Sequence, residues 1–106
     1  MIKFKWNESK NKSNRKKHAV WFEEAQQVFD DTNAILYFDK DHSTDEDRYI
    51  LLGLSSTRLL VVIHCQVNNK TIRIISARKA TKKEKVTYEK RILFLKNEMR
   101  KKPLRI

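Results

Sequence analysis

Four side chains in this sequence are the candidates for catalysis, because their types can transfer a proton or stabilise negative charge: His64, Arg48, Arg78 and Tyr88. An imidazole can act as an acid or a base near neutral pH, and His64 is an unusual residue for the apolar run in which it lies. Arg78 stands where a strand meets a helix N-terminus, which is a natural site for an anion. Each residue also has a structural alternative: His64 as a core or partner-facing histidine, Arg78 paired with Glu84, and Tyr88 packed in the core.

A second set of side chains could bind phosphate groups, and its members are Lys16, Lys17, His18, Arg58 and Arg73. The first three lie at the end of a predicted helix, where the helix dipole favours positive charge even without a ligand. Capping of that helix is therefore the alternative to phosphate contact.

The acidic segment around His42 contains several side chains of metal-binding type. His42 lies among Asp39, Asp41, Asp45 and Asp47, but the spacing fits neither an EF-hand loop nor a zinc site. We therefore expect a solvated loop there, and the sequence predicts no metal ion and no cofactor.

The elements that must position these side chains begin with a short strand and two helices. Ile2 to Trp6 alternates apolar and basic residues, which predicts a half-buried edge strand. Glu8 to Lys17 follows an Asn7 N-cap and is mostly polar, so an exposed basic helix is expected. The next helix, from about Trp21 to Phe29, has an apolar stripe formed by Trp21, Ala25 and Val28.

Four further strands are predicted in the middle of the chain. The first covers Ala34 to Phe38, and the other three cover Arg48 to Leu54, Arg58 to Val67 and Thr71 to Arg78. Short polar turns between the last three imply an antiparallel meander. The segment from Leu59 to Ile63 is apolar on both faces, which places its strand at the centre of the sheet under helices on at least one side.

The last predicted element is a helix. Thr81 and Glu84 have the spacing of a capping box, so the helix begins there, and Pro103 ends any helical run. One packing stripe follows from the positions of Tyr88, Ile92, Leu95 and Met99. The predicted order is β-α-α-β-β-β-β-α, an α+β fold with a central meander sheet covered by helices.

Loop lengths predict which side chains face each other across the meander. If both connecting loops have three residues, Arg48 lies across from His64 on one face, and His64 lies across from Ile74. Arg78 then lies across from Leu60, roughly 13 Å along the strand from His64, which is too far for one compact cluster. Either the register differs or the cleft is long, with cations distributed along the ligand.

Positive charge dominates the chain and is segregated within it. Twenty-four Lys and Arg residues oppose 13 Asp and Glu residues, which gives a net charge of +11. Nine acids fall within residues 23–47, whereas residues 48–80 hold six Lys and Arg residues and no acid. Such basic blocks attract a polyanion, so we expect RNA as the ligand and expect the acidic block to lie away from the contact face. The alternative is a surface charged for solubility.

Length and composition favour a single domain. The chain has 106 residues, enough for one core, so the domain is expected to span residues 1–106 with a basic C-terminal helix and tail at about residues 81–106. Cys65 is the only cysteine, which fits a reducing compartment such as the cytoplasm. The longest apolar stretch, Leu59 to Ile63, is too short to span a bilayer, so we expect neither membrane insertion nor secretion.

Motifs along nearly the whole chain before its C-terminal tail resemble those of the BrnT family of toxins. The Ile75-Ser76-Ala77-Arg78 segment is the most specific of them. In chain order the resembling residues are Trp6-Asn7-Glu8-x-Lys10, Asn14-x-x-Lys17-His18-x-Val20-x-Phe22-x-x-Ala25-x-x-Val28-Phe29-x-Asp31, Glu46-x-Arg48-Tyr49-Ile50-x-x-Gly53, Leu59-Leu60-Val61-Val62-x-His64, and Ile72-Arg73-Ile74-Ile75-Ser76-Ala77-Arg78-x-Ala80-Thr81 with Glu84 and Tyr88.

The resemblance implies an activity and a partner. BrnT proteins are the toxin halves of bacterial type II toxin–antitoxin pairs, have a RelE-like fold, and cut RNA to halt translation. Attack of the RNA 2′-hydroxyl on its own phosphate needs a base, a proton donor and cations, so a metal-independent endoribonuclease is expected. The implied partner is a small DNA-binding antitoxin of the ribbon-helix-helix, BrnA-like type, in a hetero-oligomer with the toxin.

Three features depart from the family pattern. Asn7 stands where the family usually has Asp, and Ala19 stands where it usually has a Gly that permits a sharp left-handed turn. The basic tail, Lys96 to Ile106, is not explained by the pattern.

Two other classes of function remain open from the residues alone. A non-catalytic RNA- or DNA-binding module would use the same basic face, with His64 as a structural residue. An interaction subunit would have its basic face covered by an acidic antitoxin segment and would have lost its own activity. Incubation with RNA separates the three classes. A ribonuclease cleaves the RNA, a binding module shifts its electrophoretic mobility without cleavage, and an interaction subunit does neither.

Overall fold

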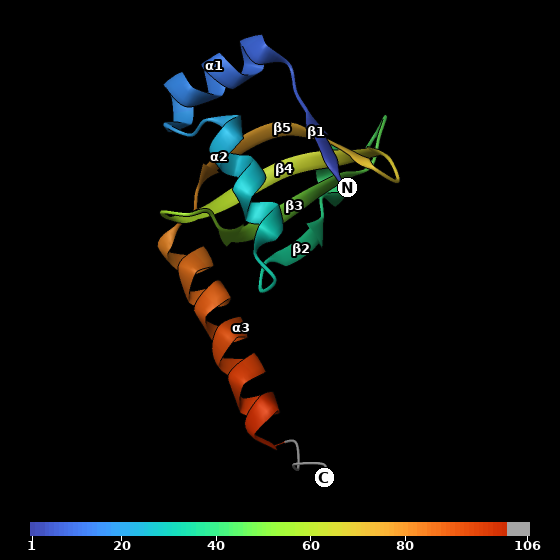
Figure 1. Ribbon diagram of the computed structural model, residues 1–106. Coiled ribbons are helices and arrows are strands. Elements are labelled where there is room, and N and C mark those ends of the chain that lie inside the picture. The colour runs from blue at the N-terminus through green and yellow to red at the C-terminus, as the bar shows by residue number, and fades with distance from the viewer. Residues whose placement is uncertain (102–106) are drawn as a thin grey trace.

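Five strands form one sheet in a computed structural model that describes residues 1–101 (Figure 1). The strand order is β1-β5-β4-β3-β2, and all neighbours are antiparallel except β1, which pairs in parallel with β5. The predicted α+β class, edge strand and central meander are confirmed. The strands are β1 (Lys3–Lys5), β2 (Ile35–Phe38), β3 (Arg48–Leu54), β4 (Leu59–Asn68) and β5 (Thr71–Lys79).

The helices are distributed unequally around this sheet. Figure 1 shows α2 lying across one face, α1 beside the β5 edge, and α3 extending away from the body. No helix within residues 1–101 is long and apolar enough to cross a membrane. The helices are α1 (Glu8–His18), α2 (Phe22–Gln27) and α3 (Lys82–Lys101), with short 3₁₀ turns η1 (Val28–Asp30) and η2 (Lys40–His42).

The main core lies between α2 and the sheet. Phe22, Ala25 and Val28 are fully buried and pack against Leu60 and Val62 of the central strand β4. The prediction that Trp21 belongs to this stripe is wrong, because Trp21 is the N-cap of α2 and is 43% exposed. Trp21 has extended backbone angles, φ −81° and ψ 147°, so its side chain does not continue the helical stripe, whereas Ala25 and Val28 are buried as predicted.

The second face of the sheet is covered at one end only. Tyr88 of α3 is buried with Leu52 and Val61, and Ile92 packs against the same cluster. The prediction of one continuous packing stripe is wrong for Met99, which is 75% exposed because α3 has by then left the sheet. The capping box of Thr81 and Glu84 is confirmed by reciprocal hydrogen bonds to the two backbone amides. Pro103 and the end of the basic tail lie outside the described residues.

The β3–β4 register differs from the predicted one by a single residue. The loop has four residues, because Arg58 lies in the turn, where its carbonyl oxygen accepts from the Ser55 amide at 2.9 Å. Arg48 consequently pairs with Cys65, and Tyr49 pairs with His64. The prediction that Arg48 and His64 share one face is therefore wrong, since adjacent residues of a strand point to opposite faces.

The β4–β5 register is partly as predicted. His64 lies across from Ile74, as expected, but a bulge between Ile63 and His64 shifts the pairs beyond it. Arg78 lies across from Val61 instead of Leu60, which places Arg78 on the open face of the sheet.

Two buried asparagines attach the polar helix α1 to the body. The Asn11 side chain accepts from the Phe22 amide at 2.7 Å and donates to Glu23 at 2.7 Å. Asn14 donates to the carbonyl oxygens of Val20 at 2.8 Å and Ala77 at 2.9 Å, and accepts from the Ala77 amide at 3.1 Å. Amide hydrogen bonds to buried backbone groups replace the apolar contacts that this helix lacks.

A left-handed residue ends α1. Ala19 has φ 61° and ψ 31°, and its amide donates to the Arg15 carbonyl oxygen at 3.0 Å. The family's glycine-type turn is thus made here by alanine, at a backbone cost of about 1 to 2 kcal/mol. The Arg58 guanidinium donates to the Ala19 carbonyl oxygen at 2.7 Å and holds the turn in place.

Replacement of Asn14 by alanine is expected to lower the free energy of unfolding by about 2 to 4 kcal/mol, because three buried backbone groups lose their partner. Urea unfolding monitored by circular dichroism measures the change. Asn97→Ala, at an exposed position of α3, is the matched control and should change stability by less than about 0.5 kcal/mol. Equal effects of the two substitutions would contradict the anchoring role of Asn14.

Candidate functional site

A basic groove lies where the end of α1 meets the end of β5. Its volume is about 550 Å³. The groove brings together the predicted phosphate-binding residues Lys16, Lys17 and His18 and the predicted catalytic residue Arg78. We call this site the α1–β5 groove, and its lining residues are Arg15, Lys16, Lys17, His18, Ala19, Arg78, Lys79 and Thr81.

The buried asparagines set the position of the groove's helical wall. Asn11, Asn14 and His18 follow one another at helical spacing, so they lie along one side of α1. Because Asn14 binds the backbone of Ala77, the residue before Arg78, the same contact fixes both walls. His18 ends the helix at the groove with its side chain exposed.

The charge of the α1–β5 groove is almost entirely positive. None of its eight lining residues is acidic. Arg78 is partly neutralised, because its guanidinium donates to Glu84 at 2.8 and 2.9 Å, and this bond lowers the Glu84 pKa to about 2. Lys16, Lys17 and Lys79 form no ion pair with any residue in the range 1–101. The groove therefore retains free positive charge for an anion.

Two lining cations were not predicted from the sequence. Arg15 lies one helical turn before His18, and its guanidinium sits over the Trp21 ring at 5.7 Å from the centroid. Lys79 follows Arg78 at the end of β5. The sequence shows these two residues only as part of its general basic character. Their position at the groove depends on the approach of α1 to β5, which the buried asparagines determine.

His64 lies in the core, on the sheet face that α2 covers. Its ring is 5% exposed and lies edge-on to Phe29 at 4.8 Å between centroids and stacked beside Tyr49 at 6.0 Å. Burial lowers the pKa of His64, which favours the neutral ring. This arrangement matches the core-histidine alternative, and it leaves His64 without access to a ligand on the open face.

Tyr88 also has a buried partner. Its hydroxyl donates to Asp31 at 2.6 Å, and burial together with this bond raises the Tyr88 pKa, so the phenol stays protonated. Burial raises the Asp31 pKa, but hydrogen bonds from Tyr88 and from the amides of Leu54 and Asn33 outweigh it, and the net shift is downward. The pair ties α3 to the loop before β2.

Arg58 is held inside the protein by an acid. It donates to Glu24 through two nitrogens, at 2.9 and 2.6 Å, while also binding the Ala19 carbonyl oxygen. The bond from Arg58 is the main reason that the Glu24 pKa is lowered. Arg58 supports the turn beside the groove and does not line the groove itself.

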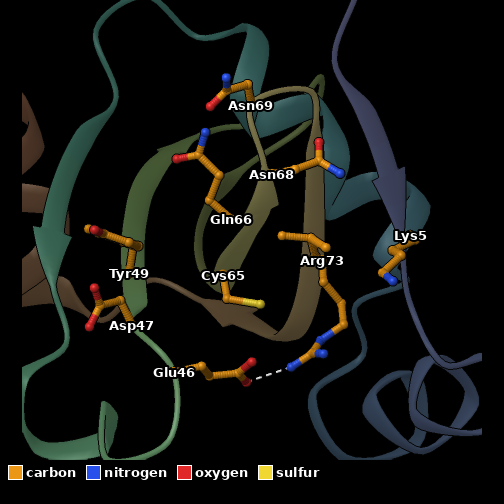
Figure 2. A pocket seen from close by; sticks show the side chains of 10 residues that line it. Lys5, Glu46, Asp47, Tyr49, Cys65, Gln66, Asn68, Asn69 and Arg73 are labelled. Atoms are coloured by element: carbon orange, nitrogen blue, oxygen red, sulfur yellow. Dashed lines mark hydrogen bonds and ion pairs between the residues drawn. The ribbon is translucent and has the colours of Figure 1, made fainter.

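Arg73 and Glu46 line a hollow of about 600 Å³ at the other end of the open face (Figure 2). Arg48 does not line this hollow, but it lies on the same face, in register with Cys65. The expectation that the acidic block lies away from the RNA contact face stays a prediction, although one acid of that block lies among these cations. Glu46 forms an ion pair with Arg73 and lies 3.6 Å from the Arg48 guanidinium. Cys65 lies between these side chains, and burial raises the pKa of its thiol, which keeps it protonated.

Metal-binding side chains do not gather in the described part of the chain. No group of three His, Cys, Asp or Glu residues within residues 1–101 is arranged to hold an ion. His42 instead contacts the Asp39 carboxylate through Nδ1 at 3.0 Å.

Comparison with known protein families decides the relationship. Residues 6–84 match the family described as "Ribonuclease toxin, BrnT, of type II toxin-antitoxin system". The chain belongs to the BrnT family. The match includes the α1–β5 groove and the meander, and it ends at Glu84, so most of α3 lies beyond the matched region.

A solved BrnT structure has a similar fold. The 1.1 Å crystal structure of the Brucella abortus ribonuclease toxin BrnT is 24% identical in sequence, with a TM-score of 0.60, and the match covers 77% of this chain and 100% of that one. Among curated protein sequences, none matches this chain. An antitoxin partner and an RNA target follow from membership of the family.

The buried ring of His64 predicts a pH dependence of stability. Its folded-state pKa is lowered, so the unfolded chain binds the proton more readily, and stability that is complete above about pH 6.5 is lost as the pH falls toward the folded-state pKa. The free energy of unfolding should therefore decrease between about pH 7 and pH 5. His64→Leu should flatten this decrease in urea titrations, and an unchanged slope would contradict the placement of the ring.

Proposed function

We propose that this BrnT family member is a metal-independent endoribonuclease that holds RNA in the α1–β5 groove. One observation carries the proposal: a groove of about 550 Å³ lined by Lys16, Lys17, His18, Arg78 and Lys79, with no acid among its lining residues. A row of free cations favours a phosphate backbone, and a ribonuclease family supplies the reason to expect RNA.

Cleavage by the RNA's own 2′-hydroxyl needs three kinds of group. A base accepts the hydroxyl proton, an acid gives a proton to the leaving oxygen, and cations stabilise the charge on the phosphorane. The groove offers an imidazole at His18 and ammonium and guanidinium groups at Lys16, Lys17 and Arg78. These residue types meet the requirement without a metal ion.

His18 is the proton-transfer residue in this proposal, and His64 is not. The His18 side chain is exposed at the groove, whereas the His64 ring is buried behind Phe29 and beside Tyr49. The roles first predicted for Arg48 and His64 as clamp and base require both at one phosphate, and their opposite faces argue against it. Arg58 and Tyr88 act as positioning residues, since both are engaged with internal carboxylates.

The cellular part of the proposal extends from the family. Cleavage of RNA inhibits translation in the cytoplasm, and a ribbon-helix-helix, BrnA-like antitoxin in a hetero-oligomer blocks it. The strand and helix order, β-α-α-β-β-β-β-α, is the one expected for a RelE-like fold. An antitoxin that neutralises the toxin would cover the free cations of the α1–β5 groove with acidic residues.

His18→Ala is expected to reduce cleavage of a defined single-stranded RNA by about 10² to 10⁴-fold, because the proton-transfer group is lost. His64→Leu should keep more than about half of the activity at temperatures where it remains folded. Single-turnover assays in the presence of EDTA measure both variants and the metal independence together. If His18→Ala keeps full activity and folded His64→Leu loses its activity, His64 and not His18 is the proton-transfer residue. An RNA shift without cleavage by the wild type would favour a binding module.

Salt dependence tests whether phosphate contacts dominate binding. With four to six neutralised phosphates, the log–log slope of affinity against salt for single-stranded RNA should be about −3 to −4. Lys16→Ala/Lys17→Ala should make the slope shallower by about 1.4, the share of two phosphates. Lys90→Ala/Lys96→Ala on α3 removes the same charge away from the groove and is the control. Equal slopes for the two double variants would show that the charge acts only diffusely.

A further inference from the structure

A row of cations crosses the open face of the sheet at the end remote from the α1–β5 groove. Lys5 of β1 pairs in register with Arg73 of β5, Arg73 with Cys65 of β4, and Cys65 with Arg48 of β3. Partners in register point to the same face, so Lys5, Arg73 and Arg48 lie in one line across four neighbouring strands, with Cys65 of β4 between the two arginines. We call these three residues the cationic row, and Figure 2 shows Lys5 and Arg73 on neighbouring strands there.

Glu46 occupies the centre of this row. Its Oε1 atom is shared between Arg73, to which it is hydrogen-bonded, and Arg48, whose Nη2 atom is 3.6 Å away. The carboxylate comes from the loop before β3 and reaches over the sheet toward Arg73 (Figure 2). A single oxygen between two guanidinium groups is the arrangement that a phosphate oxygen would also adopt.

The cationic row is incompletely satisfied by Glu46. The Nε atom of Arg48 is buried and has no hydrogen-bond partner among residues 1–101. An unpartnered guanidinium nitrogen beside a site that already holds one carboxylate shows that the donors of the two arginines outnumber the acceptor atoms that Glu46 supplies. A phosphodiester group has two terminal oxygens together with its ester oxygens and carries one negative charge, so it meets that need.

The loop that carries Glu46 is closed at its base by hydrogen bonds that do not involve Glu46. The Arg48 amide donates to the Ser43 hydroxyl at 2.9 Å, and the Asp39 amide donates to the Arg48 carbonyl oxygen at 2.8 Å. Residues 44–47 lie outside helices and strands. Loss of the Glu46 ion pair therefore leaves the hydrogen bonds at the base of the loop in place.

From these observations we infer that the cationic row is a second phosphate-binding site, and that Glu46 fills it in the free protein as an internal substitute for an RNA phosphate. The inference rests on the proposed function, because it assigns the ligand as a further phosphate of the same RNA. Arg73 and Arg78 are five residues apart on β5, or roughly 16 Å, so the row and the groove contact different nucleotides of one strand.

Competition between Glu46 and RNA gives the inference a measurable consequence. Removal of the carboxylate charge by Glu46→Gln should tighten binding of a short 2′-O-methyl RNA, which cannot be cleaved, by about ten-fold if the carboxylate occupies the site about nine-tenths of the time. Asp45→Asn is the matched control: the same loop and the same change of net charge, but no ion pair in the described structure. It should tighten binding by less than about two-fold.

Two further measurements separate local competition from general charge. Arg73→Gln in the Glu46→Gln background should remove the gain in affinity, because the phosphate loses its main partner. The salt slope of Glu46→Gln should be steeper than that of the wild type by about 0.7, since RNA then displaces a counterion from the row instead of a carboxylate. Asp45→Asn should keep the wild-type slope. Thermal melting confirms that each variant is folded, and Glu46→Ala provides a second test if Glu46→Gln is not.

The outcomes distinguish this inference from the function on which it rests. If the wild type binds and cleaves RNA but Glu46→Gln binds no more tightly than Asp45→Asn, the second phosphate site is refuted and the ribonuclease proposal stands. If neither the wild type nor Glu46→Gln binds RNA, both proposals are refuted. A ten-fold gain that depends on Arg73 supports the site.

Discussion

The amide of Asn14 is the contact on which the organisation of the molecule depends. It binds the backbone of both Val20 and Ala77, so one buried side chain joins α1, the connection to α2, and strand β5. Helix α1 has almost no apolar surface of its own and would not associate with the sheet through the hydrophobic effect. The basic residues at its end approach Arg78 only because this amide holds the helix there.

Ion pairing divides the cations of this protein into two groups. Arg48, Arg58, Arg73 and Arg78 all contact carboxylates, whereas Lys16, Lys17 and Lys79 contact none within residues 1–101. A guanidinium presents a planar fork that suits a fixed carboxylate, and an ammonium is a mobile point charge. The segregated charge blocks of the sequence therefore do not survive folding, because Glu24 and Glu46 of the acidic block each pair with an arginine from residues 48–80.

Much of the fold followed from patterns in the sequence, whereas the arrangement of the site did not. Alternation in β1, apolar character in β4 and the capping box of α3 are local signals, and local chemistry determines them. The face on which Arg48 lies depended on whether Arg58 belongs to a turn. A local hydrogen bond from the Arg58 amide to the Ser55 hydroxyl and an ion pair with Glu24, 34 residues away, together hold Arg58 in the turn. Burial of Asn14 likewise requires a partner 63 residues away. The periodicity of apolar residues predicts neither the turn position of Arg58 nor the burial of Asn14.

The distance along the chain between the two walls of the α1–β5 groove has a consequence for synthesis. The helical wall is made early, as residues 8–18, and the strand wall is made late, as part of β5 at residues 71–79. Until β5 leaves the ribosome, Asn14 can bind only Val20 and lacks its partners on Ala77, and β1 has no neighbouring strand. A nascent chain therefore carries all the basic residues of α1 but no groove, and a translating ribosome is not exposed to an assembled site before β5 has emerged.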